Sequence, residues 1–177
     1  MSNKYRKYSL SPYGYSYNEV IKIMKDFYMN CGYVGDKKQF FKERFTSHAT
    51  MRRNSEWFGL EYQRFFRVDG GTIYRMTWID THIMRKKPKW KDYPIGKRNT
   101  AFKGAYRDER TLFVELMNYY YSYCYRDRAR FEEVLKKVDI SRAYYKKKVK
   151  QYNIKVEFFM SIDGCDPFPY QCRTHKY

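Results

Sequence analysis

The pattern that most constrains the fold is a pair of amphipathic segments, separated by a short break, in residues 131–154. Four apolar residues of the first segment recur at i, i+3, i+4 and i+7: Phe131, Val134, Leu135 and Val138. This spacing places one apolar stripe on a helix. The helix should end at Asp139, and Ser141 should cap a second helix by accepting a hydrogen bond from a free N–H of its first turn.

The second segment should be a helix that runs to Tyr152, with an apolar side and a cationic side. Its inward residues are Tyr145, Val149 and Tyr152. The opposite side carries four cations: Arg142, Lys146, Lys147 and Lys150. Asn153 stands where a helix terminator is expected, because asparagine tolerates a left-handed backbone. Two short helices with this tight turn have the plan of a helix-turn-helix.

The residues of the turn and of the second helix's end, Val138–Arg142 and Lys148–Ile154, resemble the Fis-type helix-turn-helix of bacterial regulators. The resemblance covers about 24 residues of the 177. It implies that the second helix reads DNA, with Arg142, Lys146 and Lys150 at the bases. In that family glycine usually stands at the position of Asp139, and Thr-Leu at Tyr144-Tyr145. The alternative is an ordinary helical hairpin with a solvated lysine-rich face.

The charge of the chain points to a polyanionic partner. Thirty-seven Lys and Arg against nineteen Asp and Glu give a formal net charge of +18. Charge of this size produces salt-sensitive attraction to phosphate backbones. An anionic membrane surface is disfavoured, because no segment combines cationic and bulky apolar halves, and no apolar run approaches the roughly 20 residues that cross a bilayer.

A second cationic stretch lies in residues 85–107. It holds nine Lys or Arg and one acid, Asp92, with prolines and glycines that interrupt regular structure. The residues predicted to contact nucleic acid are Arg85, Lys86, Lys87, Lys89, Trp90, Lys91, Lys97, Arg98 and Lys103. Cations neutralise phosphates while aromatic rings stack on bases. The alternative is a surface loop whose aromatic residues pack into the core.

The predicted fold class is α+β, in one domain with an aromatic core. Tyr (21) and Phe (13) far outnumber the five leucines, so rings must supply most of the buried area. Ser16 and Glu19 have capping-box spacing for a helix that ends near Gly32. Asp36 should cap a shorter helix through Phe45, with Phe45 among its apolar residues.

From Gly59 the periodicity changes to alternation, and residues 60–68 and 72–79 predict a β-hairpin around Asp69-Gly70-Gly71. A helix over 109–125, the helix pair and a strand over 155–162 should complete the C-terminal part. The predicted organisation is an arm (1–15), a helix and hairpin part (16–82), a basic loop (83–108), a helical part with the final strand (109–162) and an irregular tail (163–177).

The sequence offers no convincing catalytic or metal site, and no cofactor is expected. Cys165, Cys172 and His175 have poor spacing and lack a fourth ligand for structural zinc. Two pairs of glutamates are interpreted as exposed helix charges: Glu109 with Glu115, and Glu132 with Glu133.

One enzymatic alternative rests on the similarity of two short segments to known sequence motifs. Gly71-Thr72-Ile73-Tyr74 and Tyr93-Pro94-Ile95-Gly96 are similar to the motifs of GIY-YIG nucleases. The resemblance implies metal-dependent phosphodiester hydrolysis by an Arg and a Glu. The nominated residues are Arg98 or Arg107 and Glu109 or Glu115. Thr72 and Pro94 interrupt the two motifs.

The expected function is therefore non-enzymatic binding of nucleic acid, DNA rather than RNA. The alternative from another class is a structural subunit of a large assembly, a phage virion component or a ribonucleoprotein protein, whose arms are ordered by neighbouring subunits. The polar N-terminus has no signal peptide and the four cysteines are irregularly spaced, which predicts reduced thiols in the cytoplasm, or a virion for a phage protein.

Overall fold

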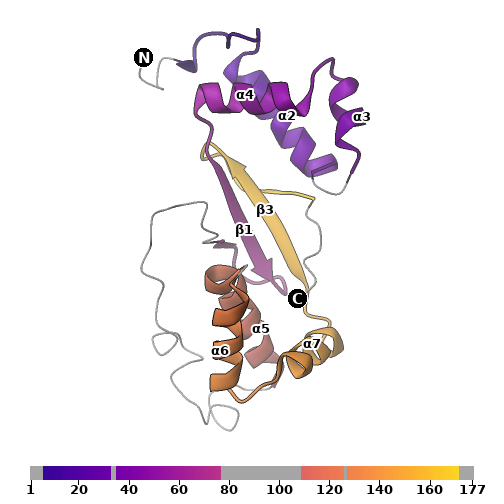
Figure 1. Cartoon of the computed structure of the whole chain (residues 1–177), viewed down its shortest axis with the longest axis vertical. Helices are drawn as coiled ribbons and strands as arrows, with labels where there is room; N and C mark the ends of the chain where they lie inside the picture. Colours follow the sequence, from indigo (N-terminus) through magenta and orange to yellow (C-terminus); the bar gives the residue numbers. More distant parts are fainter. Residues whose placement is uncertain (1–5, 33–34, 77–108, 126, 172–177) are drawn as a thin grey trace. The chain divides into compact units, whose positions relative to one another are not determined.

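The computed structural model describes residues 6–32, 35–76, 109–125 and 127–171. Helices and a small antiparallel sheet are both present, which confirms the α+β class (Figure 1). The helices in these residues are α2 (Tyr17–Asn30), α3 (Lys37–Lys42), α4 (His48–Phe58), α5 (Glu109–Tyr119), α6 (Arg128–Lys137) and α7 (Arg142–Gln151). The strands are β1 (Tyr62–Val68), β2 (Tyr74–Arg75), β3 (Val156–Ile162) and β4 (Phe168–Pro169).

These elements belong to two compact units. Unit 1 comprises residues 1–64 and 158–176, and unit 2 comprises residues 65–157 and 177. The strand order of the sheet is β2-β1-β3-β4, and β1 and β3 each contribute residues to both units. Whether the chain folds as a single domain stays a prediction.

The helix ends of unit 1 follow the caps that the sequence contains. Ser16 and Glu19 form the predicted capping box at the start of α2. Gly32 follows its end with φ +50, and a Cβ there would lie 2.5 Å from the carbonyl oxygen of Gln171, so glycine is required. Asp36 caps α3 as predicted. However, α3 ends at Lys42, so the prediction that this helix runs through Phe45 was wrong, and Phe45 is 97% exposed.

Helix α4 has no counterpart among the predictions. Its buried positions are Met51, Asn54, Ser55 and Phe58, which have the i, i+3, i+4 and i+7 spacing of a helix face. Two of these four are polar, and this hid the apolar periodicity. The side chains of Asn54 and Ser55 donate to the carbonyls of Thr50 and Met51 within the helix. Its ends do carry local signals, since Ser47 caps the start and Gly59, with φ +66, ends it.

Unit 1 has an aromatic core, as the composition predicts. Phe27, on α2, lies 5.5 Å from Phe40 and 4.9 Å from Phe41 between ring centroids. The described part of the N-terminal arm is bound to this same unit. Arg6 donates to the carbonyl of Trp57, Lys7 pairs with Asp163, and the buried hydroxyl of Ser11 donates to Asn54.

The sheet contains the predicted hairpin. Phe65 lies opposite Arg75 and Phe66 opposite Tyr74, across a turn in which Asp69 and Gly70 have positive φ. Strand β2 is shorter than the predicted 72–79, since Thr72 and Ile73 lie outside it and residues 77–79 are not among the described ones. The final strand is confirmed as β3. The stretch predicted to be irregular contains β4, whose Phe168 pairs with Met160.

Unit 2 holds the predicted three helices, which lie close together in Figure 1. A π-helical turn, Tyr120–Cys124, continues α5 to the predicted length. The rings of Phe131 and Tyr145 lie 5.1 Å apart and join α6 to α7. None of the helices in the described residues is long and apolar enough to cross a membrane.

Candidate nucleic-acid interface

The turn between α6 and α7 has one residue in the left-handed region and is closed by backbone hydrogen bonds. Asp139 has φ +55, the left-handed region that glycine usually occupies. The amide of Ile140 donates back to the carbonyl of Leu135 at 2.9 Å, which closes the end of α6. Ser141 then caps α7 by accepting from the amide of Tyr144. Asp139 can hold this conformation without a glycine, since aspartate tolerates positive φ.

The outer side of α7 is cationic and exposed. Five residues of this helix, all exposed, share that side: Ala143, Lys146, Lys147, Lys150 and Gln151. No carboxylate within the described ranges pairs with Lys146, Lys147 or Lys150. The inner side holds Tyr145 and Val149, which are 1% and 6% exposed. The predicted division of α7 into an apolar and a cationic side is thus present for these residues.

A carboxylate at the start of α5 holds the flank of α7. Glu109 accepts hydrogen bonds from the hydroxyls of Tyr144 (2.6 Å) and Tyr152 and from the ammonium of Lys148 (2.9 Å). The Lys148 nitrogen also lies within 5.3 Å of the Tyr144 ring centroid. The hydrogen bond to Glu109 holds the hydroxyl of Tyr144 at the start of α5. Lys146 and Lys147 are exposed.

The hydrogen bonds between Glu109, Tyr144, Lys148 and Tyr152 shift the pKa values of these residues. Hydrogen bonds from Tyr144, Tyr152 and Lys148 lower the pKa of Glu109 from 4.5 to about 2. The bond to Glu109 raises the pKa of Lys148 above its usual range. The interpretation of Glu109 as an exposed helix charge was therefore wrong. Its partners lie 35 to 43 residues away in the sequence, so no local pattern could have revealed them.

The pKa of Glu109 gives a pH-dependent stability. A lowered pKa contributes stability that is present above about pH 4.5 and lost as the pH falls toward 2. Glu109→Gln should lower the free energy of unfolding at pH 7 by about 1–2 kcal/mol, a figure that allows for solvent screening of the partly exposed ion pair. Urea unfolding at pH 7 and near pH 2.5 should show the difference from wild type shrinking in acid. Glu133→Gln, on the exposed side of α6, should change stability little at both pH values.

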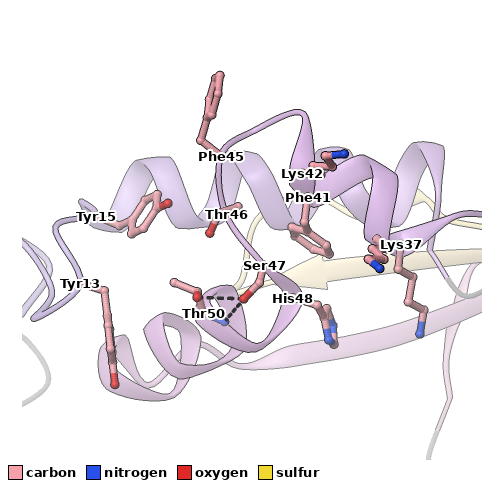
Figure 2. A pocket seen from close by; sticks show the side chains of 11 residues that line it. Tyr13, Tyr15, Lys37, Phe41, Lys42, Phe45, Thr46, Ser47, His48 and Thr50 are labelled. Carbon is pink, nitrogen blue, oxygen red and sulfur yellow. Dashed lines mark hydrogen bonds between the residues drawn. The ribbon is translucent and has the colours of Figure 1, made fainter.

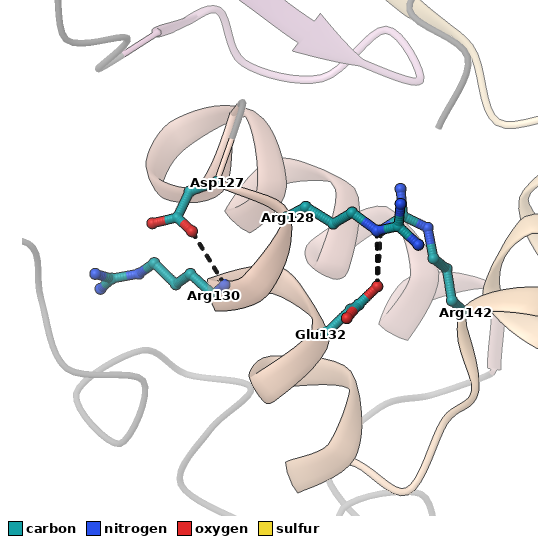
Figure 3. A network of polar contacts seen from close by, with 5 residues as sticks. All are labelled: Asp127, Arg128, Arg130, Glu132 and Arg142. Carbon is teal, nitrogen blue, oxygen red and sulfur yellow. Dashed lines mark hydrogen bonds and ion pairs between the residues drawn. The ribbon is translucent and has the colours of Figure 1, made fainter.

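A second carboxylate links α6 to α7 (Figure 3). Glu132 accepts from Arg128 at 2.9 Å on its own helix and from Arg142 at 3.3 Å on α7. Arg142 is consequently 28% exposed and lies against Glu132, so it does not share the outer side with the three lysines. Glu132 is 40% exposed, as its interpretation as an exposed helix charge predicts, but its two ion pairs were not foreseen. Asp127 caps α6 by accepting from the amide of Arg130.

The remaining predicted residues do not form a site in the part of the chain that the structure describes. The nine residues predicted in the basic loop lie outside it: Arg85, Lys86, Lys87, Lys89, Trp90, Lys91, Lys97, Arg98 and Lys103. The second nuclease-like motif at 93–96, Arg107, Cys172 and His175 lie outside it too. Burial raises the pKa of Glu115, the other nominated glutamate. Among the described residues, no group of three His, Cys, Asp or Glu could hold a metal ion.

Comparison with known proteins identifies no relative of this chain, so a functional assignment depends on its own local geometry. No protein-family model, no curated protein and no solved structure matches the chain.

Proposed function

We propose that this chain is a non-enzymatic DNA-binding protein that presents α7 to the major groove. The observation that carries the proposal is the exposed row of Lys146, Lys147 and Lys150, which no carboxylate in the described ranges neutralises. Unneutralised cations on one helix side attract phosphates and release counterions on binding. Ala143 lies on the same side, and its short side chain allows the helix backbone to come close to the groove floor.

The neighbouring residues have supporting roles in this proposal. Lys136 and Lys137, exposed at the end of α6, contact phosphates beside the turn. Arg142 is oriented by Glu132 and sets the angle between the helices. Gln151 and Lys150 supply hydrogen-bond donors to base edges. A DNA duplex is favoured over an RNA duplex because an α-helix enters the wide major groove of B-DNA, whereas the A-form major groove is too narrow.

The proposal is tested by fluorescence anisotropy with duplex DNA, single-stranded DNA and duplex RNA at about 50 and 200 mM salt. Three to five phosphate contacts predict that duplex affinity falls about 40- to 500-fold across that range. Duplex DNA should bind most tightly. Tighter binding of duplex RNA, or an affinity that does not change with salt, would contradict the proposal.

The structural-subunit alternative draws support from exposed apolar residues on the N-terminal arm. Tyr8 is 91% and Leu10 is 63% exposed, although the arm is bound to unit 1 through Arg6 and Lys7. A structural subunit would pack these exposed apolar residues against neighbouring subunits. Its cations would then attract duplex DNA without sequence preference. Selection of bound duplexes from a random pool separates the two functions, because a DNA-reading α7 should enrich a defined sequence.

A further inference from the structure

A pocket of about 940 Å³ lies at the start of α4 in unit 1 (Figure 2). Its walls come from four segments: the N-terminal arm, α3, the connection between α3 and α4, and the first turn of α4. This volume is in the range of pockets that bind small molecules. Every residue that lines it belongs to the described part of the chain.

The wall of this pocket is positively charged. Helix α3 contributes Lys37, Lys38 and Lys42, and none of the described residues that line the pocket is acidic. The first turn of α4 also has no acidic residue. The amides of His48 and Ala49 have no acceptor within the helix, because they belong to its first turn. Lysines and the first turn of α4 therefore contribute to the same pocket wall, a combination that favours an anion.

Phe45 forms an exposed aromatic surface at this pocket. It lies in the connection between α3 and α4, and Figure 2 shows its ring projecting from the backbone. Its side chain is 97% exposed, and its φ of +53 is in the left-handed region that bulky residues avoid. A strained backbone that holds a large ring in water points to a binding role for that ring. Tyr13, from the arm, is 46% exposed on the same pocket.

Thr46 and His48 are polar residues in the wall of this pocket. Thr46 also lines the pocket, and its hydroxyl oxygen, which is buried, has no hydrogen-bond partner among the described residues. The His48 ring packs 5.5 Å from the rings of Phe27 and Phe41. Burial, and then the charges of Lys37 and Arg52, lower the pKa of His48. This lowering favours the neutral form of the His48 ring, in which one nitrogen is a hydrogen-bond donor and the other an acceptor.

We propose that this pocket binds a nucleoside phosphate, either free or as one nucleotide of a single strand. The phosphate lies between the α3 lysines and the amino end of α4, and the base stacks on Phe45. The phosphate and the base of such a ligand each have a partner in the wall. An inorganic anion would make no contact with the Phe45 ring, and an uncharged nucleoside would not pair with the lysines. The proposal concerns unit 1 and does not depend on DNA binding by α7 in unit 2.

Calorimetric titration of the full chain tests the proposal with 2′-deoxyadenosine 5′-monophosphate, 2′-deoxyadenosine and inorganic phosphate. The monophosphate should bind at least about tenfold more tightly than either fragment. Phe45→Ala should weaken its binding about 5- to 10-fold through loss of stacking. Lys42→Ala should weaken it about fivefold through loss of a phosphate contact. Both side chains are exposed, so thermal melts of the two variants should match wild type.

Matched controls remove an exposed ring or an exposed charge elsewhere in unit 1. Tyr8→Ala and Lys22→Ala should leave the affinity for the monophosphate unchanged. Binding of a short oligodeoxyadenylate but not of the mononucleotide, with the same loss in Phe45→Ala, assigns the site to a nucleotide within a strand. Equal affinities for monophosphate and nucleoside would overturn the proposal. So would absence of binding by both the monophosphate and the oligonucleotide.

Discussion

Replacing Lys146, Lys147 and Lys150 together by alanine should weaken binding to duplex DNA at least about 100-fold at 0.1 M salt. The three ammonium groups lie on the exposed side of α7 without acidic partners in the described residues. Each phosphate contact contributes about 0.9 to the slope of log K against log salt, so the slope should fall by about 2.7. Fluorescence anisotropy at several salt concentrations measures both quantities.

The matched control removes the same charge from unit 1. Lys22, Arg52 and Arg53 are exposed on α2 and α4, and their combined replacement by alanine should weaken binding less than about threefold. Urea unfolding should show that both triple variants are folded, because all six side chains are at the surface. If the two triple variants lose affinity equally, binding depends on net charge and α7 has no special role.

Phe113→Ala should lower the free energy of unfolding by about 3–5 kcal/mol, the usual cost of truncating a buried phenylalanine. Phe113 belongs to α5, is 0% exposed and packs against α7. Its ring centroid lies 6.0 Å from that of Tyr145 and 6.1 Å from those of Tyr144 and Tyr152. Removing the ring leaves a cavity beneath α7. Urea denaturation followed by circular dichroism provides the measurement.

Phe45→Ala is the control for this truncation. The same number of atoms is removed, but Phe45 is 97% exposed, so the free energy of unfolding should change by less than about 0.5 kcal/mol. If Phe113→Ala lowers the free energy of unfolding by less than about 1 kcal/mol, packing of Phe113 against Tyr144, Tyr145 and Tyr152 contributes little to stability. The proposed support of α7 by α5 would then be incorrect.

The helix pair could be predicted from the sequence because its determinants are local. The apolar spacing from Phe131 to Val138 encodes α6, and the Ser141 hydroxyl fixes the start of α7. Asp139 and Asn153 both adopt positive φ, at the two positions where the helices were predicted to end. Caps and terminators act over three or four residues, so one sequence suffices to place them.

The contacts that hold this pair could not be predicted, because they join residues distant in sequence. Glu109 meets Lys148 only after α5 packs on α7, and either residue alone has the appearance of a surface charge. Helix α4 was missed for a different reason. Asn54 and Ser55 occupy buried positions where apolar residues are expected, and their hydrogen bonds within the helix compensate for their burial.

The pocket of unit 1 was missed as a consequence of the missed helix. The proposed phosphate site depends on the amino end of α4, and the proposed stacking depends on Phe45, which was predicted to be an apolar residue of the preceding helix. The contribution of residues 85–107 to nucleic-acid binding stays a prediction, since those residues lie outside the described part of the chain. The proposed binding of duplex DNA therefore depends on α7 and the turn that precedes it.

The most direct test of this proposed binding is amide NMR of the full chain during titration with duplex DNA. The largest chemical-shift changes in the described residues should fall on Ser141 to Gln151 and on Lys136 and Lys137, with small changes in α2 and α4. Largest changes on α2 and α4, with an unperturbed α7, would contradict the claim that the exposed side of α7 is the surface that binds DNA.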